Sequence, residues 1–403
     1  MDRTARLGGA DFMRAVACLL VLAHHLVLRM NFDKIPDALS LPFHIARFGS
    51  YGVAVFFVLS GFLLSRPFWL ALDRAQPLPS LKIYIMRRAA RILPGFWVAL
   101  TIGFVLSFAV YGFPLDGELI GRYLAGFFLM SQWHWRTFFP VQGDGPLWSI
   151  PFETTCYVLL PIGFLLLFSP RLRPRSAFVG RMLWILVIAA ALAGHWLVVT
   201  CLPTDSTGRG WLYGFQGGAK EWMPRYNPIG FFAIFAIGAL AAGIQTMIPA
   251  KRSLAYDAIG LAAIAVGAFQ LYLSIGGDWE GYGWLGIPYG FPVFPLAVAA
   301  ALCTLPQSVL LASLLDNGLS RYIATVSFGV YIWQDIVLTL MQKLLPWTFG
   351  AGADNMLPGW VASSLVATAI IFTIGTLSYA LLERPVMRWA RTREHIAKRP
   401  ATA

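Results

Sequence analysis

The chain has 403 residues, of which 58% are hydrophobic and only 12% are charged. Ordinary soluble domains carry about a quarter charged residues, so this composition excludes a typical soluble protein and favours one that lies in a lipid bilayer. The net charge of +12 would suit nucleic acid, but the Lys and Arg residues cluster in short loops between apolar stretches, as in membrane proteins. We therefore exclude nucleic acid as a partner.

Apolar stretches long enough to cross a bilayer recur along the whole chain. A spanning helix needs roughly 20 mostly apolar residues. The segments that meet this requirement are 11–30, 48–66, 92–113, 148–168, 182–202, 227–248, 254–275, 285–307, 325–344 and 359–382. The stretch 119–132 is too short to cross and is expected to be re-entrant or interfacial. The sequence thus predicts an all-α, polytopic integral membrane protein with about ten transmembrane helices.

The charges of the loops set the predicted orientation. Basic residues gather in the N-terminal segment, in loops such as 67–91 and after the last span, whereas most acidic residues fall in the other loops. Because cytoplasmic loops are the basic ones, we expect both termini to be cytoplasmic. We expect a membrane domain over residues 1–385 and a basic tail over 386–403. The outer loops 114–147 and 203–226 are rich in Gly, Pro and Trp and could fold over an outward-facing cavity.

The first predicted span contains ionisable residues, which are costly in a membrane and point to function by default. Arg14 and His25 are eleven residues apart, three helical turns plus about 20°, so they lie on one helix face about 16 Å apart. A long ligand with an anionic head could span the two. The competing interpretation is that Arg14 reaches lipid phosphates and His25 is a core histidine. Spacing alone does not separate these interpretations.

The fourth predicted span contains a carboxylate, Glu153, shortly after Trp148. Glu153 would lie about 8 Å below the start of this span, at a depth that His25 shares from its own helix. A carboxylate beside an imidazole raises its basicity and fixes its tautomer, which a general base for a hydroxyl acceptor requires. We favour this interpretation over a structural ion pair or a helix cap, because a lone buried carboxylate is costly.

A cluster of basic residues, Arg87, Arg88 and Arg91, precedes the third span. Most such clusters only enforce topology. Arginine also pairs bidentately with phosphate, and coenzyme A carries a 3′-phosphate and a pyrophosphate. The cluster is therefore a candidate CoA site.

Polar residues also lie in the ninth predicted span. Ser327, Tyr331 and Gln334 fall near one helix face, and Asp335 is an ionisable residue that requires a partner or a cavity. His195, near the outer end of the fifth span, is a reserve candidate.

Together these motifs resemble the acyltransferase-3 family of membrane O-acyltransferases, which modify O-antigens, other glycans and some antibiotics. The resemblance runs from Asp11 to about Pro385. Its elements, in chain order, are Arg14-x10-His25, the stretch Tyr51–Phe62, Arg87-Arg88-x-x-Arg91, Leu147-Trp148-Ser149 with Glu153 and Tyr157, the stretch Ser327–Trp333, and Leu382-Glu383-Arg384-Pro385.

The resemblance implies a ten-helix fold in the cell membrane and a cytosolic acyl-CoA co-substrate, with acetyl-CoA expected and no metal. The family's site residues carry over as follows: Arg14, Arg87, Arg88 and Arg91 hold the CoA, His25 is catalytic, and Glu153 lies beside it. Trp148, Tyr331, Gln334 and Asp335 are then expected to contact substrate. Where the family often has a histidine after Tyr-x-Trp, this chain has Gln334, and Asp335 next to it could take over that role.

The predicted function is transfer of an acyl group, expected to be acetyl, from cytosolic acyl-CoA to a hydroxyl at the outer side of the membrane. The acceptor contains carbohydrate or is a small molecule, and succinyl or a longer branched acyl group would suit the same scaffold. His25, supported by Glu153, acts as base or is itself acylated as a relay. The alternative is a proton-coupled secondary transporter, although no internal repeat is visible. A purely structural role leaves the buried ionisable residues unexplained.

Overall fold

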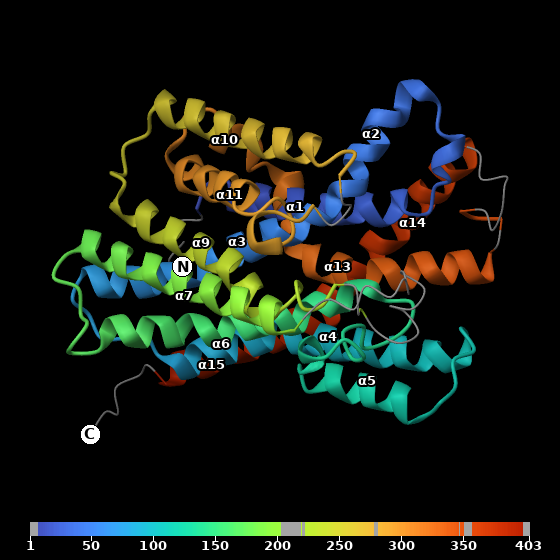
Figure 1. Ribbon diagram of the computed structural model, residues 1–403, viewed down its shortest axis with the longest axis horizontal. Coiled ribbons are helices and arrows are strands. Elements are labelled where there is room, and N and C mark those ends of the chain that lie inside the picture. The colour runs from blue at the N-terminus through green and yellow to red at the C-terminus, as the bar shows by residue number, and fades with distance from the viewer. Residues whose placement is uncertain are drawn as a thin grey trace.

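The structure is a computed structural model that describes residues 7–202, 219, 222–277, 281–345, 347–349 and 357–397, with side chains through Glu394 in the last range. Most of the predicted outer loop 203–226 and the end of the predicted tail lie outside the described residues. The described part is helical without strands, which confirms the all-α prediction (Figure 1). Its α-helices are α1 Ala10–Val27, α2 Asp37–Arg47, α3 Gly52–Asp73, α4 Leu81–Ala109, α5 Gly117–Phe127, α6 Ser149–Phe168, α7 Ala177–Cys201, α9 Pro228–Met247, α10 Leu254–Leu273, α11 Val293–Thr304, α12 Leu311–Leu315, α13 Gly318–Leu344, α14 Leu357–Ser378 and α15 Arg384–Ala397.

Nine helical stretches of the described chain are long and apolar enough to cross a membrane. The segment 285–307, which the sequence predicts as a further span, forms only the 12-residue helix α11. The helix starts late because the residues before it form a loop in which Gly286 and Gly290 have positive φ angles of 73° and 59°. The short stretch predicted at 119–132 corresponds to α5, which has 11 residues. A polytopic membrane protein is confirmed.

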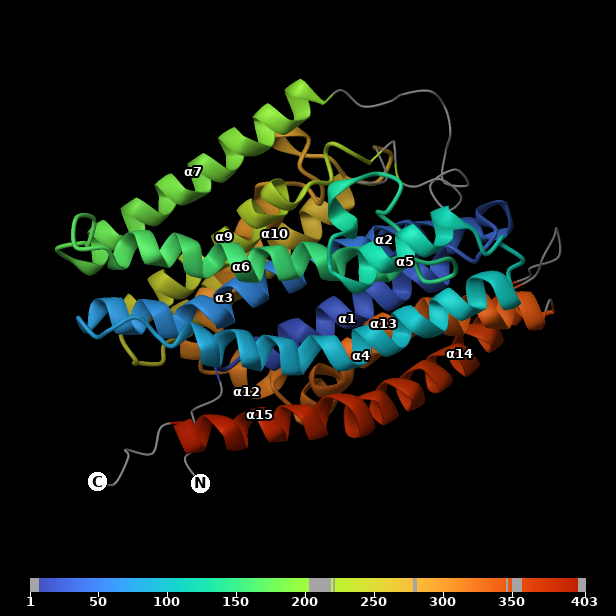
Figure 2. The same ribbon diagram turned by 90° about the horizontal axis from the view of Figure 1, so that it is seen from below.

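Helix α1 lies in the middle of the bundle, with α3 on one side and α13 on the other (Figure 2). Its residues Ala15, Cys18 and Leu22 follow helical spacing and pack against α13. On the opposite side α3 starts at Gly52, where an added Cβ would lie 2.4 Å from the Ala17 carbonyl oxygen. Small residues on both sides thus allow α1 to lie within a close-packed core.

Contacts between helix ends define one end of the bundle. The Asp316 carboxylate accepts hydrogen bonds from the backbone N–H groups of Gly9 (2.8 Å) and Phe12 (3.1 Å), so α1 and α13 start side by side. Arg87 at the start of α4 pairs with Glu394 near the end of α15 at 2.5 Å. This end contains the basic residues that the sequence predicts to be cytoplasmic, and we call it the inner end.

The predicted basic tail begins with α15, which continues α14 through the π-turn Tyr379–Glu383 and packs along α4. In Figure 2, α14 and α15 form one long arc along the lower edge of the bundle. The first part of the predicted tail therefore belongs to the helical bundle.

The reserve candidate His195 is a structural residue. Its side chain is fully buried, with Nε2 3.1 Å from the Leu285 carbonyl oxygen and Nδ1 2.8 Å from the Asn227 amide nitrogen. Both ring nitrogens are occupied, so His195 joins α7 to the start of α9 and to the loop before α11.

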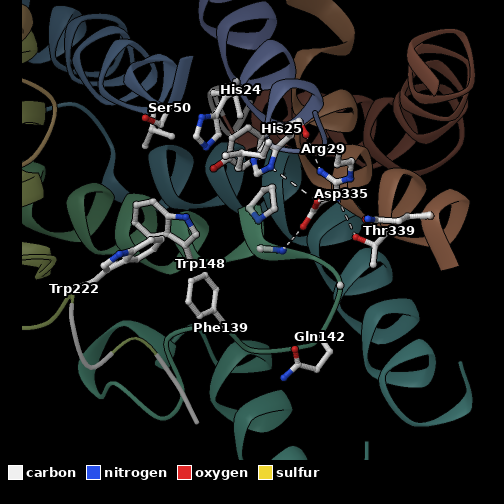
Figure 3. A pocket seen from close by; sticks show the side chains of 18 of the residues that line it. His24, His25, Arg29, Ser50, Phe139, Gln142, Trp148, Trp222, Asp335 and Thr339 are labelled. Carbon is white, nitrogen blue, oxygen red and sulfur yellow. Dashed lines mark hydrogen bonds and ion pairs between the residues drawn. The ribbon is translucent and has the colours of Figure 1, made fainter. Parts of the chain in front are cut away.

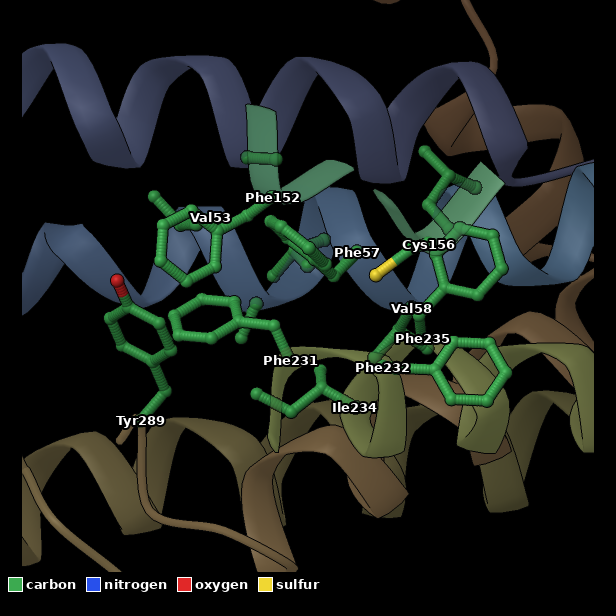
Figure 4. Close-up of a cluster of buried hydrophobic side chains, with 14 of the residues drawn as sticks. Val53, Phe57, Val58, Phe152, Cys156, Phe231, Phe232, Ile234, Phe235 and Tyr289 are labelled. Carbon is green, nitrogen blue, oxygen red and sulfur yellow. The ribbon is translucent and has the colours of Figure 1, made fainter. Parts of the chain in front are cut away.

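Helices α3 and α9 pack against each other with their backbones in contact. Figure 4 shows the aromatic cluster between them, in which Phe57 of α3 meets Phe231 of α9. The approach requires glycine on both helices: a Cβ on Gly61 would lie 2.0 Å from the Phe235 carbonyl oxygen, and one on Gly238 would lie 1.9 Å from that of Val58. This contact holds α3 and α9 together beside the site described below.

We predict that Gly238→Ala destabilises the protein by at least about 1–3 kcal/mol, the usual cost of overpacking. The measurement is thermal unfolding in detergent. Gly121→Ala is the matched control, because an added Cβ there meets nothing within 4 Å and alanine is the better helix former. Equal melting temperatures for Gly238→Ala and Gly121→Ala would contradict the packing.

Candidate active site

A cavity of about 430 Å³ opens among the helix ends opposite the inner end. Its size suits a small-molecule ligand. The end of α1, the start of α3, the loop 139–146 and the middle of α13 line it, together with Trp222 and Tyr226. Described residues of both predicted outer loops contribute to the wall of this cavity. We call it the outer cavity.

A histidine and two charged residues form the polar corner of the outer cavity (Figure 3). Asp335 pairs with Arg29 at 2.6 Å, and its Oδ1 lies 3.9 Å from Nδ1 of His25. The other Asp335 oxygen accepts a hydrogen bond from the Gly145 N–H at 2.9 Å. Arg29 also donates to Thr339 at 3.2 Å. The carboxylate thus accepts hydrogen bonds from two groups, Arg29 and the Gly145 N–H, and the oxygen bound by Arg29 also faces His25.

Helical periodicity places these groups. Asp335 and Thr339 are four residues apart on α13 and share one helix face. His25 lies in the last turn of α1, and Arg29 lies two residues beyond the end of this helix, in the turn that follows it. Arg29 reaches back to donate to the His25 carbonyl oxygen at 2.7 Å. Sequence reasoning missed Arg29, although its i+4 spacing from His25 and the unpaired charge of Asp335 were signals for it.

The predicted pairing of His25 with Glu153 is wrong, because Asp335 occupies that place. Glu153 accepts hydrogen bonds from Ser60 (2.7 Å) and Tyr157 (2.5 Å) and lines a second cavity. The reason is helix direction. Helix α6 runs towards the inner end, so Glu153 lies one turn further inward than Ser149, whereas α13 runs outward and brings Asp335 towards His25.

The second cavity, which we call the inner cavity, is narrow and basic. Its volume is about 90 Å³, and Arg14, Arg88 and Arg91 line it together with Glu153. Arg91 pairs with the buried Glu383 of the π-turn at 2.6 Å. The side chains of Arg14 and Arg88 have no hydrogen bond or ion pair to any residue in the described part of the chain. The cavity therefore offers two uncommitted cations to an anionic ligand.

The other predicted site residues divide between the cavities and the interior. Trp148 lines the outer cavity, and Tyr331 lines both. Gln334 is only 1% exposed and lines neither cavity, and its amide donates to the Tyr331 carbonyl oxygen at 3.2 Å. Arg87 points to α15, where it pairs with Glu394, and is absent from the wall of the inner cavity.

A buried carboxyl group lies next to the ion pair. Asp144 has no exposed surface, and neither of its carboxylate oxygens has a hydrogen-bond partner in the described part of the chain. Burial raises the pKa of Asp144 well above its ordinary value, and the nearby charge of Asp335 raises it further. Burial and the nearby charge therefore both favour the neutral form of the Asp144 carboxyl group.

The described part of the chain is thus a helical membrane protein with a basic cavity towards one end of the bundle and a histidine–carboxylate cavity towards the other. Residues 7–378 match the family model of acyltransferase 3, described as an acyltransferase domain. The chain belongs to this acyltransferase family and is a multi-pass protein of the plasma membrane. Family membership does not support the transporter alternative.

Curated relatives match this chain over most of its length at low sequence identity. The chain is 25% identical to peptidoglycan O-acetyltransferase OatA of Listeria monocytogenes over 96% of its length, but spans only 58% of that protein. It is 25% identical to acyltransferase MdmB of Streptomyces mycarofaciens, covering 100% of this chain and 97% of that one. It is 26% identical to exopolysaccharide production protein ExoZ of Rhizobium meliloti, covering 87% and 93%.

We predict that Asp144→Asn changes the pH dependence of stability. A carboxyl group whose pKa is raised by folding stabilises the fold in acid, and this contribution is lost as pH rises through the folded-state value. Because asparagine does not titrate, the melting temperature of Asp144→Asn minus that of the wild type should increase between pH 4 and pH 9. The exposed carboxylate variant Asp33→Asn is the control. A difference that is flat with pH would contradict the buried neutral acid.

Proposed function

We propose that the protein transfers an acyl group, acetyl in the simplest case, from cytosolic acyl-CoA to a hydroxyl of a carbohydrate-containing acceptor at the outer side of the membrane. The observation that carries the proposal is the pair of cavities, basic on the inner side and histidine-containing on the outer side, that meet within one helical bundle. A donor and an acceptor can thus approach from opposite membrane surfaces.

The donor site is the inner cavity. Arg14 and Arg88 are the uncommitted cations there, and guanidinium groups bind phosphates through charge-assisted hydrogen bonds. A volume of about 90 Å³ is far too small for the nucleotide of CoA, so the nucleotide would remain at the inner surface. Only the slender pantetheine arm would enter. Arg87, which the family resemblance includes in this site, is excluded from our proposal because Glu394 holds it.

The reacting base is His25. The acceptor hydroxyl attacks the thioester carbonyl carbon, so a C–O bond forms while the C–S bond breaks. His25 takes the hydroxyl proton and passes it to the departing CoA thiolate. Asp335, 3.9 Å from the ring, stabilises the imidazolium, and Arg29 holds Asp335 in place. A relay through acyl-His25 uses the same groups and predicts an acetylated protein when acetyl-CoA is supplied without acceptor.

Glu153 is assigned to the donor side. Its carboxylate holds Ser60 and Tyr157 at the wall of the inner cavity, one turn inward from the wall that the two cavities share. In this place it positions the pantetheine arm through its hydrogen-bonded neighbours and balances the arginine charges when no donor is bound.

The acceptor site is the outer cavity. Aromatic rings form much of its wall, among them Phe139, Trp148, Trp222 and Tyr226. Such rings offer apolar faces to the C–H faces of sugars, with polar edges that can hydrogen-bond. Relatives named for peptidoglycan and exopolysaccharide support a carbohydrate acceptor.

The test is thiol release from acetyl-CoA and succinyl-CoA by purified protein in detergent. His25→Ala should lower kcat by roughly 10²–10⁴-fold, the usual contribution of a general base. Arg88→Ala should raise KM for acetyl-CoA about tenfold or more with little change in kcat, because a hydrogen bond to a charged group contributes about 1.5–3 kcal/mol to binding.

Arg87→Ala is the matched control for Arg88→Ala. Its guanidinium pairs with Glu394 and is half exposed, so KM should change by less than about threefold. Equal effects of the two variants would contradict the assignment of the inner cavity to the donor. Failure of the wild type to consume either thioester in the presence of a glycan acceptor would overturn the proposed function.

A further inference from the structure

The two cavities share two wall residues. Val53 of α3 and Tyr331 of α13 line both the inner and the outer cavity, and every other lining residue belongs to one cavity alone. Both side chains are buried, with exposed fractions of 6%. Val53 and Tyr331 are therefore the residues at the boundary between the two cavities, and we call this boundary the neck.

Hydrogen bonding and packing hold the Tyr331 side of the neck in place. The Tyr331 hydroxyl lies 2.6 Å from the Ser149 hydroxyl at the start of α6. The ring of Phe56, one turn after Val53 on α3, packs edge-on against the Tyr331 ring with centroids 5.8 Å apart. Three helices thus converge on this point, and the phenol cannot swing aside without breaking the bond to Ser149.

The neck lies on the path from the donor site to His25. Ser327, Tyr331 and Asp335 are spaced by four residues and form one stripe along α13. Ser327 lines the inner cavity, Tyr331 lines both, and Asp335 lines the outer cavity beside His25. One helical turn rises about 5.4 Å, so a thioester that passes Tyr331 reaches the His25–Asp335 pair within about one turn.

We propose that the neck formed by Val53 and Tyr331, closed by the Tyr331–Ser149 hydrogen bond, selects the donor by the size of its acyl group. This inference rests on the proposed function. The acyl group is the leading end of an acyl-CoA that enters from the inner cavity, so it is the first part of the donor to meet the neck. Acetyl is the smallest such group, whereas a longer chain must displace a buried side chain.

The test compares acetyl-CoA, butyryl-CoA and hexanoyl-CoA in the thiol-release assay, with inhibition by free CoA as an independent measure of a folded donor site. Val53→Ala removes two methyl groups from the neck and should raise kcat/KM for hexanoyl-CoA relative to acetyl-CoA at least tenfold. The inhibition constant of free CoA should stay the same, since free CoA carries no acyl group. Val55→Ala is the matched control, because Val55 is buried on the same helix and lines neither cavity.

A second pair of variants tests the hydrogen bond. Tyr331→Phe and Ser149→Ala each remove it and should relax the acyl preference to a similar extent, and the double variant should relax it no further. Both variants must first be shown to consume acetyl-CoA and to be inhibited by free CoA. If the ratio of kcat/KM for hexanoyl-CoA to that for acetyl-CoA is then unchanged in Val53→Ala and in Tyr331→Phe, the neck does not select the acyl group, and the proposed function is unaffected. A wild type that consumes no thioester would remove both proposals.

Discussion

A carboxylate in a membrane domain is tolerated only where other groups compensate its charge, and Asp335 depends on such groups from two other parts of the chain. Arg29 comes from the turn that follows α1, and the Gly145 N–H comes from the segment before α6. Loss of any of these contacts would leave a buried charge without compensation. The contacts that compensate the charge of Asp335 also bring the end of α1, the loop before α6 and α13 together. The position of His25 beside Asp335 therefore depends on these contacts.

A second carboxylate fixes the other end of the same pair of helices. Asp316 caps the first turn of α1 through two backbone N–H groups, a favourable place for a negative charge. Asp316 and Asp335 are nineteen residues apart, and their partners Gly9 and Arg29 are twenty apart. Because the two intervals are nearly equal, the contacts at both ends fix how far α1 and α13 are shifted along each other. This register decides that Arg14 reaches the inner cavity while His25 reaches the outer one.

Hydropathy and helical periodicity were sufficient to predict the helical membrane fold, because it depends on local spacing along the chain. Which carboxylate lies beside His25 depends on the directions in which the helices run in the fold. Glu153 and Asp335 both lie in spans near the boundary of the cavities, but α6 and α13 run in opposite directions, so one residue points inward and the other outward. The partners of Arg29 and Arg87 lie about 300 residues away in the chain, beyond the reach of any spacing argument. The helix expected at 285–307 is shorter in the structure because a loop precedes α11, and hydropathy does not predict this loop.

A donor bound at the inner arginines should present its acyl group to His25. A structure determined with a non-hydrolysable thioether analogue of acetyl-CoA tests it most directly. We expect phosphates within hydrogen-bond distance of Arg14 or Arg88, the pantetheine arm beside Val53 and Tyr331, and the acyl carbonyl in the outer cavity beside His25. An analogue bound with its acyl end away from His25, or with its phosphates in the outer cavity, would show that the inner arginines are not the donor site for His25.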